Sequence, residues 1–575
     1  MRPEILALRA TNQYRSRDVI AYLGLRYYFA NVCASRDRWA MEVATHLVRA
    51  RTEAPYFKAK HFKDFIGDDV VLHRNIFIPG PNEAFAEAAL LAQCAEHAAF
   101  TPLPCVFSYH LAMGGESQGV YVPYFDGFRR RHEKIREACT DNPNSVVFYT
   151  DIKKFYPSIP SYKALEAWNQ ACLDSHLLPQ WRDLGLKLLA DHLNVATKTQ
   201  ESRAVLTGPM FSHLIANLVM RTVDDHMVNL FPNRYFRYVD DVVLVGSNEQ
   251  VATGRKKLTE LLASLDLHLH DQDQEKDFVV PSVEWLEGAA DLDNDYGKEW
   301  ANFVGGLKQL IVTQPAARHS LADRFLAADF RIPLPSYDLD VRTAPWLIKL
   351  RARITRYPWL LKVIKRNDAE RLIQNAHVLR EQYGRALAAL VELGTSSNRY
   401  TRKRAIPKLR FFAGRLLYIG SAEMLLQFSK SLGTIPELRM LSIILYSVAT
   451  RDVTKLVPLG TNAVQSAAQV LAISALPVSC QIKNWTPECL QGVAILRFNG
   501  ITVDAPSDDA LNRLAVWGGK GPDLMGADSD ASLLELACLH GVSASARHSE
   551  TLTSVFDWDE SLAFDVINQV QDSDY

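Results

Sequence analysis

The order of apolar and polar positions divides the chain into a mixed first half and a helical second half. Up to residue 70 the pattern is mostly helix-like. Short apolar runs bounded by Gly, Pro and Asn then predict strands between helices. From residue 341 onward the pattern is almost wholly helical. We expect strands at 70–78, 105–111, 145–151, 235–246 and 302–307, and a strand that leads into a polar loop over 267–278. We expect helices at 82–98, 127–139, 247–265 and directly after 208–209.

The segment Tyr235–Gly246 is the most informative of these. Aromatic and β-branched residues flank the adjacent Asp240 and Asp241, which predicts two strands joined by a tight turn. Adjacent carboxylates repel each other, and each raises the pKa of the other unless a cation lies between them. An acidic turn on a solvated surface explains the pair equally well when the segment is taken alone.

Two upstream segments favour the cation. An apolar strand delivers Asp151 at its end, where a carboxylate is costly to desolvate unless it is paired or binds a metal. A helix N-cap is the alternative role for this residue. Further along, Gly208-Pro209 opens an apolar helix on which Ser212 and Ala216, four residues apart, share a face. Small residues there would let another chain approach the backbone, although an ordinary junction of loop and helix has the same pattern.

Composition sets broader bounds. At 575 residues the chain exceeds a single core, so we expect two or more domains. No apolar run reaches the roughly 20 residues of a membrane span, and residues 1–4 do not begin a secretory signal. The eight cysteines are scattered without a CxxC pair, which indicates reduced thiols rather than a disulfide frame or a zinc site. We therefore expect a cytoplasmic protein with no membrane association.

The charges are segregated although the net charge is only −1. Segment 342–415 holds eighteen Lys and Arg against four Asp and Glu, whereas segment 501–575 holds three against fourteen. A basic surface of this kind could hold phosphates, and an acidic end could shield that surface. Charged helices that simply face solvent are the alternative.

Taken in order, the motifs resemble those of the reverse transcriptases. Asp151–Tyr156 is similar to the first catalytic motif of that family, and Tyr238–Asp241 is similar to its catalytic hairpin. Gly208–Asn217 resembles the motif that contacts template and nucleotide. Lys276 stands where the following motif places a lysine, and Phe303–Gly306 resembles the primer-grip turn.

The resemblance covers about residues 70–310 and implies an α+β right-hand polymerase fold. Fingers with N-terminal helices would span 1–140, and a palm with an antiparallel sheet would span 141–312. A mostly α-helical C-terminal domain would follow over 313–575, with stacked helix pairs as one arrangement.

By the same resemblance, Asp151 and Asp240 would bridge two Mg²⁺ ions about 4 Å apart, with Mn²⁺ as an alternative. The carbonyl of Ile152 would be a further ligand. Asp241 would be an auxiliary carboxylate near the primer terminus. Hard oxygen ligands from neighbouring strands suit Mg²⁺.

The remaining site residues concern the nucleotide. The ring of Tyr156 would lie where a ribose 2′-hydroxyl would go, so dNTPs are the expected substrates. Gly208, Pro209 and Ser212 would contact the nucleotide. Lys276 would protonate the leaving pyrophosphate.

Two positions depart from the family pattern. Thr207 replaces the glutamine that helps to position the nascent base pair. His110 stands where related enzymes commonly carry an arginine that binds triphosphate, and Arg74 is the first candidate to compensate. Other candidates are Lys58, Lys60 and Lys63. These departures leave ordinary templated copying open to question.

The long helical C-terminal region, without a recognisable ribonuclease H, maturase or endonuclease segment, resembles the bacterial abortive-infection and defence-associated reverse transcriptases. That implies antiphage DNA synthesis, protein-primed or relaxed in its use of a template, by a homo-oligomer. The nucleic-acid partners would be an RNA template or non-coding RNA and the DNA product. The alternatives are a retron-like or intron-derived enzyme that copies a bound RNA into cDNA, and a nucleic-acid-binding protein without activity.

Overall fold

The computed structural model describes residues 9–10, 13, 56–67, 70–79, 81–113, 119–122, 124–200, 202–271, 276–289, 296–313, 318–332, 369–474 and 476–506. Almost all of the helix-like segment expected before residue 55 therefore lies outside the described residues. So do the basic segment up to residue 368 and most of the acidic segment 501–575.

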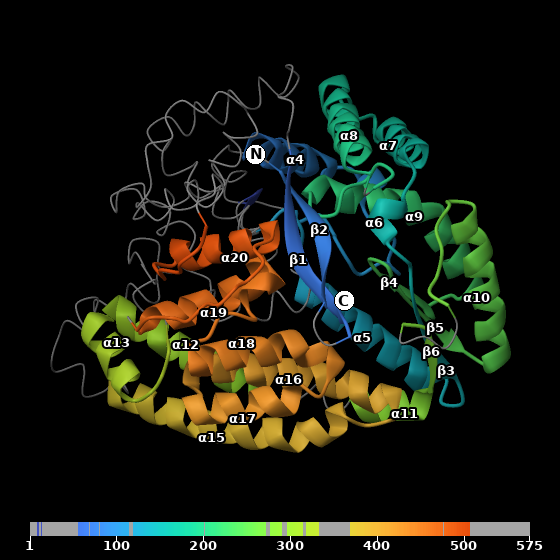
Figure 1. Ribbon diagram of the computed structural model, residues 1–575. Helices are drawn as coiled ribbons and strands as arrows, with labels where there is room; N and C mark the ends of the chain where they lie inside the picture. The colour runs from blue at the N-terminus through green and yellow to red at the C-terminus, as the bar shows by residue number, and fades with distance from the viewer. Residues whose placement is uncertain are drawn as a thin grey trace, which may run out of the picture.

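A long antiparallel hairpin runs through the centre of the molecule (Figure 1). It consists of β1 (Tyr56–Ile66) and β2 (Val70–Pro79), which pair from Tyr56↔Pro79 to Ile66↔Val70. The strand predicted at 70–78 is confirmed. The helical pattern expected up to residue 70 is wrong for β1, because pairing with β2 satisfies its backbone and overrides local propensity.

Between the hairpin and residue 235 the structure describes five long helices. They are α4 (Pro81–Cys94), α5 (Tyr124–Asp141), α7 (Ser161–Ser175), α8 (Pro179–Thr199) and α9 (Met210–Leu230). The helices predicted at 82–98, at 127–139 and after 208–209 are thus confirmed. Helix α9 packs against α4 and α7, and α8 packs against α4 and α7.

A separate four-stranded sheet carries the acidic segments. Its strands are β3 (Val146–Asp151), β4 (Tyr235–Tyr238), β5 (Asp241–Gly246) and β6 (Phe278–Pro281). Their order is β4-β5-β3-β6, and every neighbouring pair is antiparallel. The strand at 145–151 and the two strands of the 235–246 hairpin are therefore confirmed.

Helices cover both faces of this sheet. Helices α5 and α11 (Ser282–Ala289) pack on one face, and α10 (Asn248–Ala263) packs on the other beside α9. Along β5, Val243 and Val245 join the core under α5, whereas Val242 and Leu244 join the core on the other side. Burial on both faces explains the uninterrupted apolar run after Asp241.

The strand predicted at 105–111 is wrong. Segment 105–111 forms only isolated bridges, because the backbone of Tyr109 takes a left-handed φ of 55° that ends an extended run. The strand expected to start at residue 267 and lead into a polar loop is limited, among the described residues, to a bridge between Leu269 and Ile152. Residues 272–275 lie outside the described residues, and β6 begins at Phe278.

The segment 302–307, expected to be a strand with a primer-grip turn, lies inside α12 (Tyr296–Thr313). Its buried positions follow the helical spacing i, i+3, i+4 and i+7: Trp300, Phe303, Val304 and Leu307. This face packs against α15, where the ring of Trp300 contacts Tyr383. The adjacent glycines do not end the element, so the strand prediction gave them too much weight.

The described part of the C-terminal region is helical. Its helices are α13 (Arg318–Ala327), α15 (Ala369–Gly394), α16 (Arg399–Ile419), α17 (Ala422–Leu432), α18 (Arg439–Thr450), α19 (Thr461–Ile473) and α20 (Pro487–Phe498). Neighbours in sequence pack as pairs: α15 with α16, α17 with α18, and α19 with α20. A regular helical repeat stays a prediction, as do the domain boundaries.

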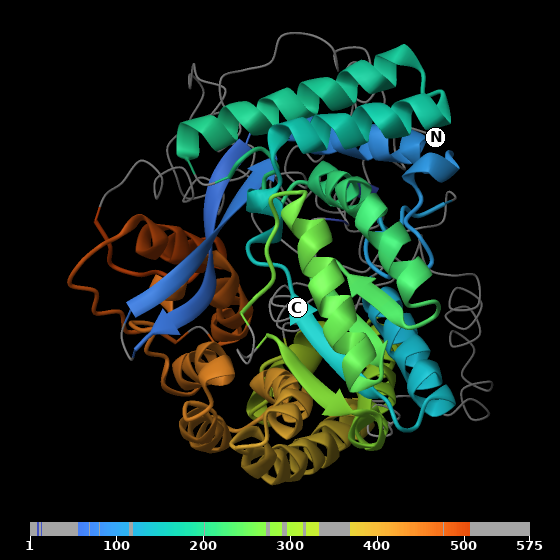
Figure 2. The same ribbon diagram turned by 90° about the vertical axis from the view of Figure 1, so that its right-hand side faces the viewer.

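The hairpin packs on these C-terminal helices rather than on the four-stranded sheet. In Figure 2 the hairpin and that sheet lie apart, with the helices of residues 369–450 along the lower edge between them. Lys60 Nζ forms an ion pair with Glu488 Oε1 at 2.8 Å, and His61 bonds Asn462 at 2.8 Å. One continuous hydrophobic core joins helices of the first half to α15–α20.

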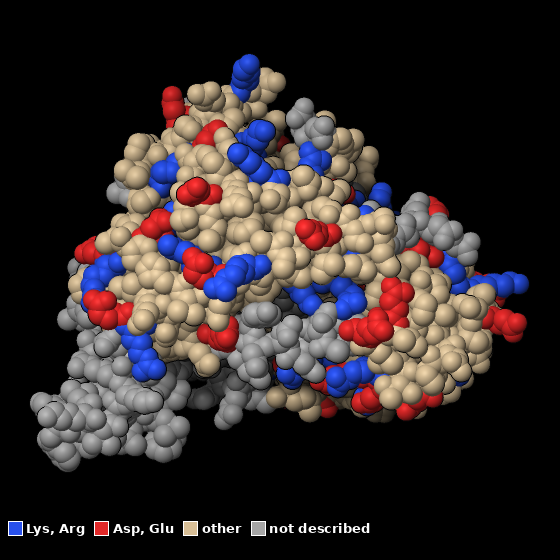
Figure 3. Space-filling view, turned by 90° about the horizontal axis from the view of Figure 1, so that it is seen from below, with Lys and Arg blue, Asp and Glu red and all other residues tan. Residues whose placement is uncertain are grey.

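Several arginines in the described part of the basic segment have their partners within the protein. Arg415 is 6% exposed and lies over the ring of Phe411. Arg380 donates to the carbonyls of Ala328 and Asp329, and Arg402 pairs with Glu437 at 3.1 Å. In Figure 3 basic and acidic side chains intermix over one face, and one group of basic side chains lies in a hollow.

Among the helices that the structure describes, none has both the length and the apolarity needed to cross a bilayer.

Candidate active site

The pairing of β3 with β5 brings the two acidic segments together. Asp151, the last residue of β3, pairs with Asp241, the first residue of β5. Asp240 lies in the turn between β4 and β5, and its carbonyl accepts a hydrogen bond from the Ile152 N–H at 3.1 Å. Asp151 therefore meets the adjacent Asp240 and Asp241, which lie far from it in sequence, at one end of the sheet.

The charges at this end of the sheet are strongly coupled. Burial, and then the carboxylates of Asp151 and Asp241, raise the pKa of Asp240 well above its ordinary value. Lys276 opposes this effect, with Nζ at 2.8 Å from Asp151 Oδ2. Burial would lower the pKa of Lys276, but the aspartates raise it, so its ammonium group keeps its charge. His270 Nε2 lies 3.3 Å from the same Asp151 oxygen.

The turn itself is held in an uncommon conformation. Val239 has a φ of 56°, which is rare for a β-branched residue and costs about 1–3 kcal/mol. Its N–H donates to Ser108 Oγ at 2.8 Å, and its carbonyl accepts from Arg237 Nη1 at 2.8 Å. These two bonds fix the residue immediately before Asp240.

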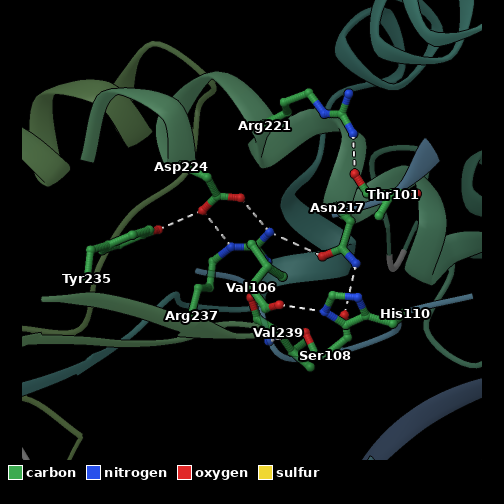
Figure 4. Close-up of polar contacts among 10 residues, drawn as sticks. All are labelled: Thr101, Val106, Ser108, His110, Asn217, Arg221, Asp224, Tyr235, Arg237 and Val239. Carbon is green, nitrogen blue, oxygen red and sulfur yellow. Dashed lines mark hydrogen bonds and ion pairs between the residues drawn. The ribbon is translucent and has the colours of Figure 1, made fainter. Parts of the chain in front are cut away.

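Arg237 connects this turn to helix α9 (Figure 4). Its guanidinium donates to both carboxylate oxygens of Asp224, at 2.8 and 2.7 Å, and to Asn217 Oδ1 at 3.1 Å. Tyr235 donates to the same Asp224 at 2.7 Å. The side chains of Arg237 and Asp224 are 0% and 1% exposed, so the pair depends on these bonds to offset desolvation.

A second buried arginine lies beside the aspartates. Arg131, on α5, has a side chain only 4% exposed, and its Nη1 is 3.9 Å from Asp241 Oδ2. Its guanidinium lies over the rings of Phe128 and Tyr238. Nε and Nη1 make no hydrogen bond with the residues that the structure describes. Arg131 therefore offers a positive charge to Asp241 without a close bond to it.

Tyr156 lies on the four-residue helix α6 (Phe155–Ser158), which follows β3 after a left-handed Lys154. Its hydroxyl is 2.7 Å from Nδ1 of His213, in the first turn of α9. Tyr156, the residue predicted to exclude a ribose 2′-hydroxyl, is thus hydrogen-bonded to α9, the helix predicted to contact the nucleotide.

The loop before α9 is fastened to the hairpin. Gly208 has a φ of 123°, and a Cβ there would lie 2.5 Å from the carbonyl oxygen of Phe77. Pro209 is the N-cap of α9. Ser212, in the first turn, is fully buried, and its Oγ has no partner among the described residues. Its side chain faces the core, and its contact with a nucleotide stays a prediction.

The two residues considered as triphosphate ligands, His110 and Arg74, differ in the charge that they can offer. His110 Nε2 bonds the carbonyl of Val106 at 2.6 Å, and burial lowers the pKa of His110, so a neutral imidazole is expected near pH 7. Such a ring supplies no counter-charge for a triphosphate. Arg74 lies half-buried on β2, opposite His61. Of the lysines named with it, Lys60 is already paired with Glu488.

The donor set fits a divalent cation in its chemistry. Three carboxylates gather at one end of the sheet, where burial and then repulsion from Asp151 and Asp241 raise the pKa of Asp240; a cation would relieve that repulsion. Within the described ranges, no group of three His, Cys, Asp or Glu side chains is already arranged as a metal cage. Lys276 takes one oxygen of Asp151 instead, and a cation would compete with it.

Sequence reasoning missed four contributors: Arg131, Arg237, His213 and His270. Arg237 gave a signal, because an arginine within an aromatic strand must be paired if the strand is buried. Arg131 stood unremarked in an arginine-rich helix. The two histidines gave no signal, since their partners are distant in sequence.

No protein-family model matches the chain, and no curated protein matches it. Among solved structures, a telomerase from Candida albicans in complex with the TWJ fragment of telomeric RNA is similar at 10% sequence identity, with a TM-score of 0.24. The similarity covers 42% of this chain and 47% of that chain, so this chain spans less than half of the telomerase. A TM-score this low does not establish a shared fold.

Proposed function

We propose that this protein is a nucleotidyltransferase of the reverse-transcriptase type, which polymerises DNA from dNTPs. One observation carries the proposal: Asp151, Asp240 and Asp241 meet at one end of an antiparallel sheet, where burial and then repulsion from the other two carboxylates raise the pKa of Asp240. In an acidic turn on a solvated surface, by contrast, water and salt screen the repulsion between neighbouring carboxylates.

In the proposed reaction, the 3′-hydroxyl of a primer gives up its proton to solvent water, and its oxygen bonds to the α-phosphorus of a dNTP. The bond from that phosphorus to the bridging oxygen breaks, and pyrophosphate leaves. Two bound Mg²⁺ or Mn²⁺ ions would stabilise the attacking and leaving oxygens. Asp151 and Asp240, with the Ile152 carbonyl, would hold these ions.

The other residues have supporting roles in the proposal. Asp241 is the auxiliary carboxylate, with its charge balanced by Arg131 at 3.9 Å. Lys276, held charged by the aspartates, donates the proton that pyrophosphate acquires. The ring of Tyr156 excludes a ribose 2′-hydroxyl. A neutral His110 is a poor ligand for a triphosphate. The triphosphate would instead bind cationic side chains of the hairpin, such as Arg74.

The test is incorporation of labelled dNTPs by the purified full-length chain with Mg²⁺. The wild-type protein should incorporate label, and the Asp240→Ala, Asp241→Ala double variant should lose at least about 10³-fold of the rate, the order seen when a positioned electrostatic group is removed. Thermal unfolding of both proteins controls for folding. Equal incorporation by the double variant would sink the proposal.

We further propose a role in bacterial antiphage defence, with protein-primed or template-relaxed synthesis by a homo-oligomer that binds RNA and its DNA product. The support is the long helical C-terminal region and the departures at Thr207 and His110. DNA should be sequenced from cells with and without phage and tested for covalent attachment to protein. Equal plaque counts in cells with and without the wild-type protein would remove the defence role.

A second candidate is a retron-like or intron-derived enzyme that copies a bound RNA. A discrete structured RNA that copurifies with matching cDNA would favour it. A third is a nucleic-acid-binding protein without activity, which the gathered carboxylates disfavour. Full phage protection by the aspartate variants would revive this third candidate.

A further inference from the structure

The hydroxyl of Tyr156 is bonded to a histidine whose own ring is fixed on two sides. His213 Nδ1 lies 2.7 Å from Tyr156 Oη, and the bond ties the far end of the tyrosine ring whichever atom donates. The His213 ring stacks on Tyr109 at 3.8 Å between centroids and 5° between planes. Tyr121 contacts it edge-on at 5.9 Å. His213 is 4% exposed, so its ring has little room to move.

The rings around His213 are themselves fastened to the site. Tyr109 has a φ of 55°, an uncommon backbone conformation that turns this segment away from an extended path. The preceding residue, Ser108, accepts the hydrogen bond from the N–H of Val239 at 2.8 Å. Tyr121 donates its hydroxyl to the Met210 carbonyl, in the first turn of α9, at 2.8 Å. The aromatic cluster therefore joins the turn before Asp240 to the helix that carries His213.

A steric barrier against a 2′-hydroxyl works only if the ring that forms it cannot turn aside. Tyr156 lies on a helix of four residues and is half-buried, so packing alone restrains its ring on part of its surface. The bond to His213 adds a restraint at the opposite end from the backbone. A phenylalanine at position 156 would have the same ring without this restraint.

We propose that His213 is a positioning residue for sugar selection: it holds the ring of Tyr156 in place, so that nucleotides with a 2′-hydroxyl are rejected. This inference rests on the proposed function and adds to it the means by which dNTPs are distinguished from rNTPs. His213 acts through Tyr156 and does not itself contact the substrate.

The experiment compares dNTP and rNTP incorporation by the full-length protein and four variants. His213→Phe keeps an aromatic ring for the stack on Tyr109 but removes Nδ1. Tyr156→Phe keeps the gate ring but removes its hydroxyl. Each single variant should lower the ratio of dNTP to rNTP rates by up to about tenfold, the range expected for one buried hydrogen bond. The double variant should lower it no further, because both changes remove the same bond.

Tyr156→Ala is the reference for complete loss of the ring and should lower the ratio more than either single variant. An unchanged ratio in His213→Phe, with a lowered ratio in Tyr156→Ala, would overturn the inference and leave the proposed function intact. If His213→Phe does not fold, Tyr156→Phe carries the test alone, and an unchanged ratio there overturns the inference. Wild-type protein that incorporates neither nucleotide would overturn the proposed function, and this inference with it.

Discussion

At the scale of single residues, the main feature is the concentration of buried charge around the aspartate turn. Arg237 and Asp224 form a fully buried pair under Val239, and Arg131 lies over Tyr238. Buried pairs of this kind contribute little net stability, but breaking one leaves an uncompensated charge. The main effect of removing either arginine should therefore be the cost of a carboxylate left without its counter-charge.

Arg237→Met tests this reading. The variant leaves the Asp224 carboxylate buried without its cation, so the free energy of unfolding should fall by about 3–5 kcal/mol. Lys134→Met, in the exposed pair with Glu137, is the control and should change it by less than about 1 kcal/mol. Both are measured by denaturant unfolding. A loss below about 1 kcal/mol for Arg237→Met would show that the buried pair is not needed.

Glu87 predicts a pH effect on stability. Burial raises its pKa to about 7, although Phe211 N–H and Tyr56 hydroxyl donate to it. Its ordinary value is 4.5, so the folded state favours the protonated acid. The stabilisation is present below pH 4.5 and is lost as the pH rises toward 7.

At 1.36 kcal/mol per pKa unit, the difference corresponds to about 3 kcal/mol. The unfolding free energy of wild type relative to Glu87→Gln should therefore fall by up to that amount between pH 4.5 and about 7.5. The comparison cancels the opposite contribution of His192, whose pKa burial lowers to about 3. A difference that stays constant with pH would contradict the raised pKa of Glu87.

At the scale of elements, the sequence predicted the strands whose apolar pattern follows directly from their own burial. The strand ending at Asp151 and the hairpin around Asp240 were predictable, because burial on both faces requires unbroken apolar runs. The helix α12 was not, because its glycines resemble strand-ending signals when its partner α15 is unknown. Nor was the bond from Tyr156 to His213, which depends on how α6 and α9 meet.

The two helical glycines Gly185 and Gly305 give opposite predictions. A Cβ at Gly185 in α8 would lie 2.1 Å from the buried ring of Trp168, whereas a Cβ at Gly305 in α12 meets nothing within 4 Å. Gly305→Ala should raise the free energy of unfolding by about 0.5–1 kcal/mol, because alanine costs less backbone entropy in a helix.

Gly185→Ala should lower the same free energy by about 1–3 kcal/mol through overpacking. Thermal unfolding of the two variants and the wild type measures both effects. Destabilisation by Gly305→Ala would indicate that residues 302–307 form a turn, as the sequence suggested, and not the interior of α12.

At the scale of the whole molecule, the hairpin and the C-terminal helices behave as one packed unit. Lys60 on β1 and Glu488 on α20 are 31% and 13% exposed and lie 2.8 Å apart, although more than four hundred residues separate them. Arg439 donates to the Gly67 carbonyl at the hairpin tip, and His73 bonds the carbonyl of Pro458. The sequence could not predict this docking, because nothing in either segment marks the other as its partner.

A double-mutant cycle tests the docking. Lys60→Gln and Glu488→Gln should each destabilise the protein, and their coupling energy should be about 1–2 kcal/mol, since the pair is largely shielded from solvent. The local exposed pair Lys257 and Glu260 on α10 serves as the control, with an expected coupling below about 0.5 kcal/mol. Additive effects of Lys60→Gln and Glu488→Gln would contradict the docked arrangement.

The central claim is that the three aspartates perform nucleotidyl transfer. Single-turnover assays with Mg²⁺ should follow pyrophosphate release and product length together, in wild type and in the nearly isosteric Asp240→Asn variant. The account predicts one pyrophosphate for each nucleotide added by wild type, and a rate at least about 10³-fold lower for Asp240→Asn with unchanged thermal unfolding. Equal rates of coupled release and extension by the two proteins would contradict it.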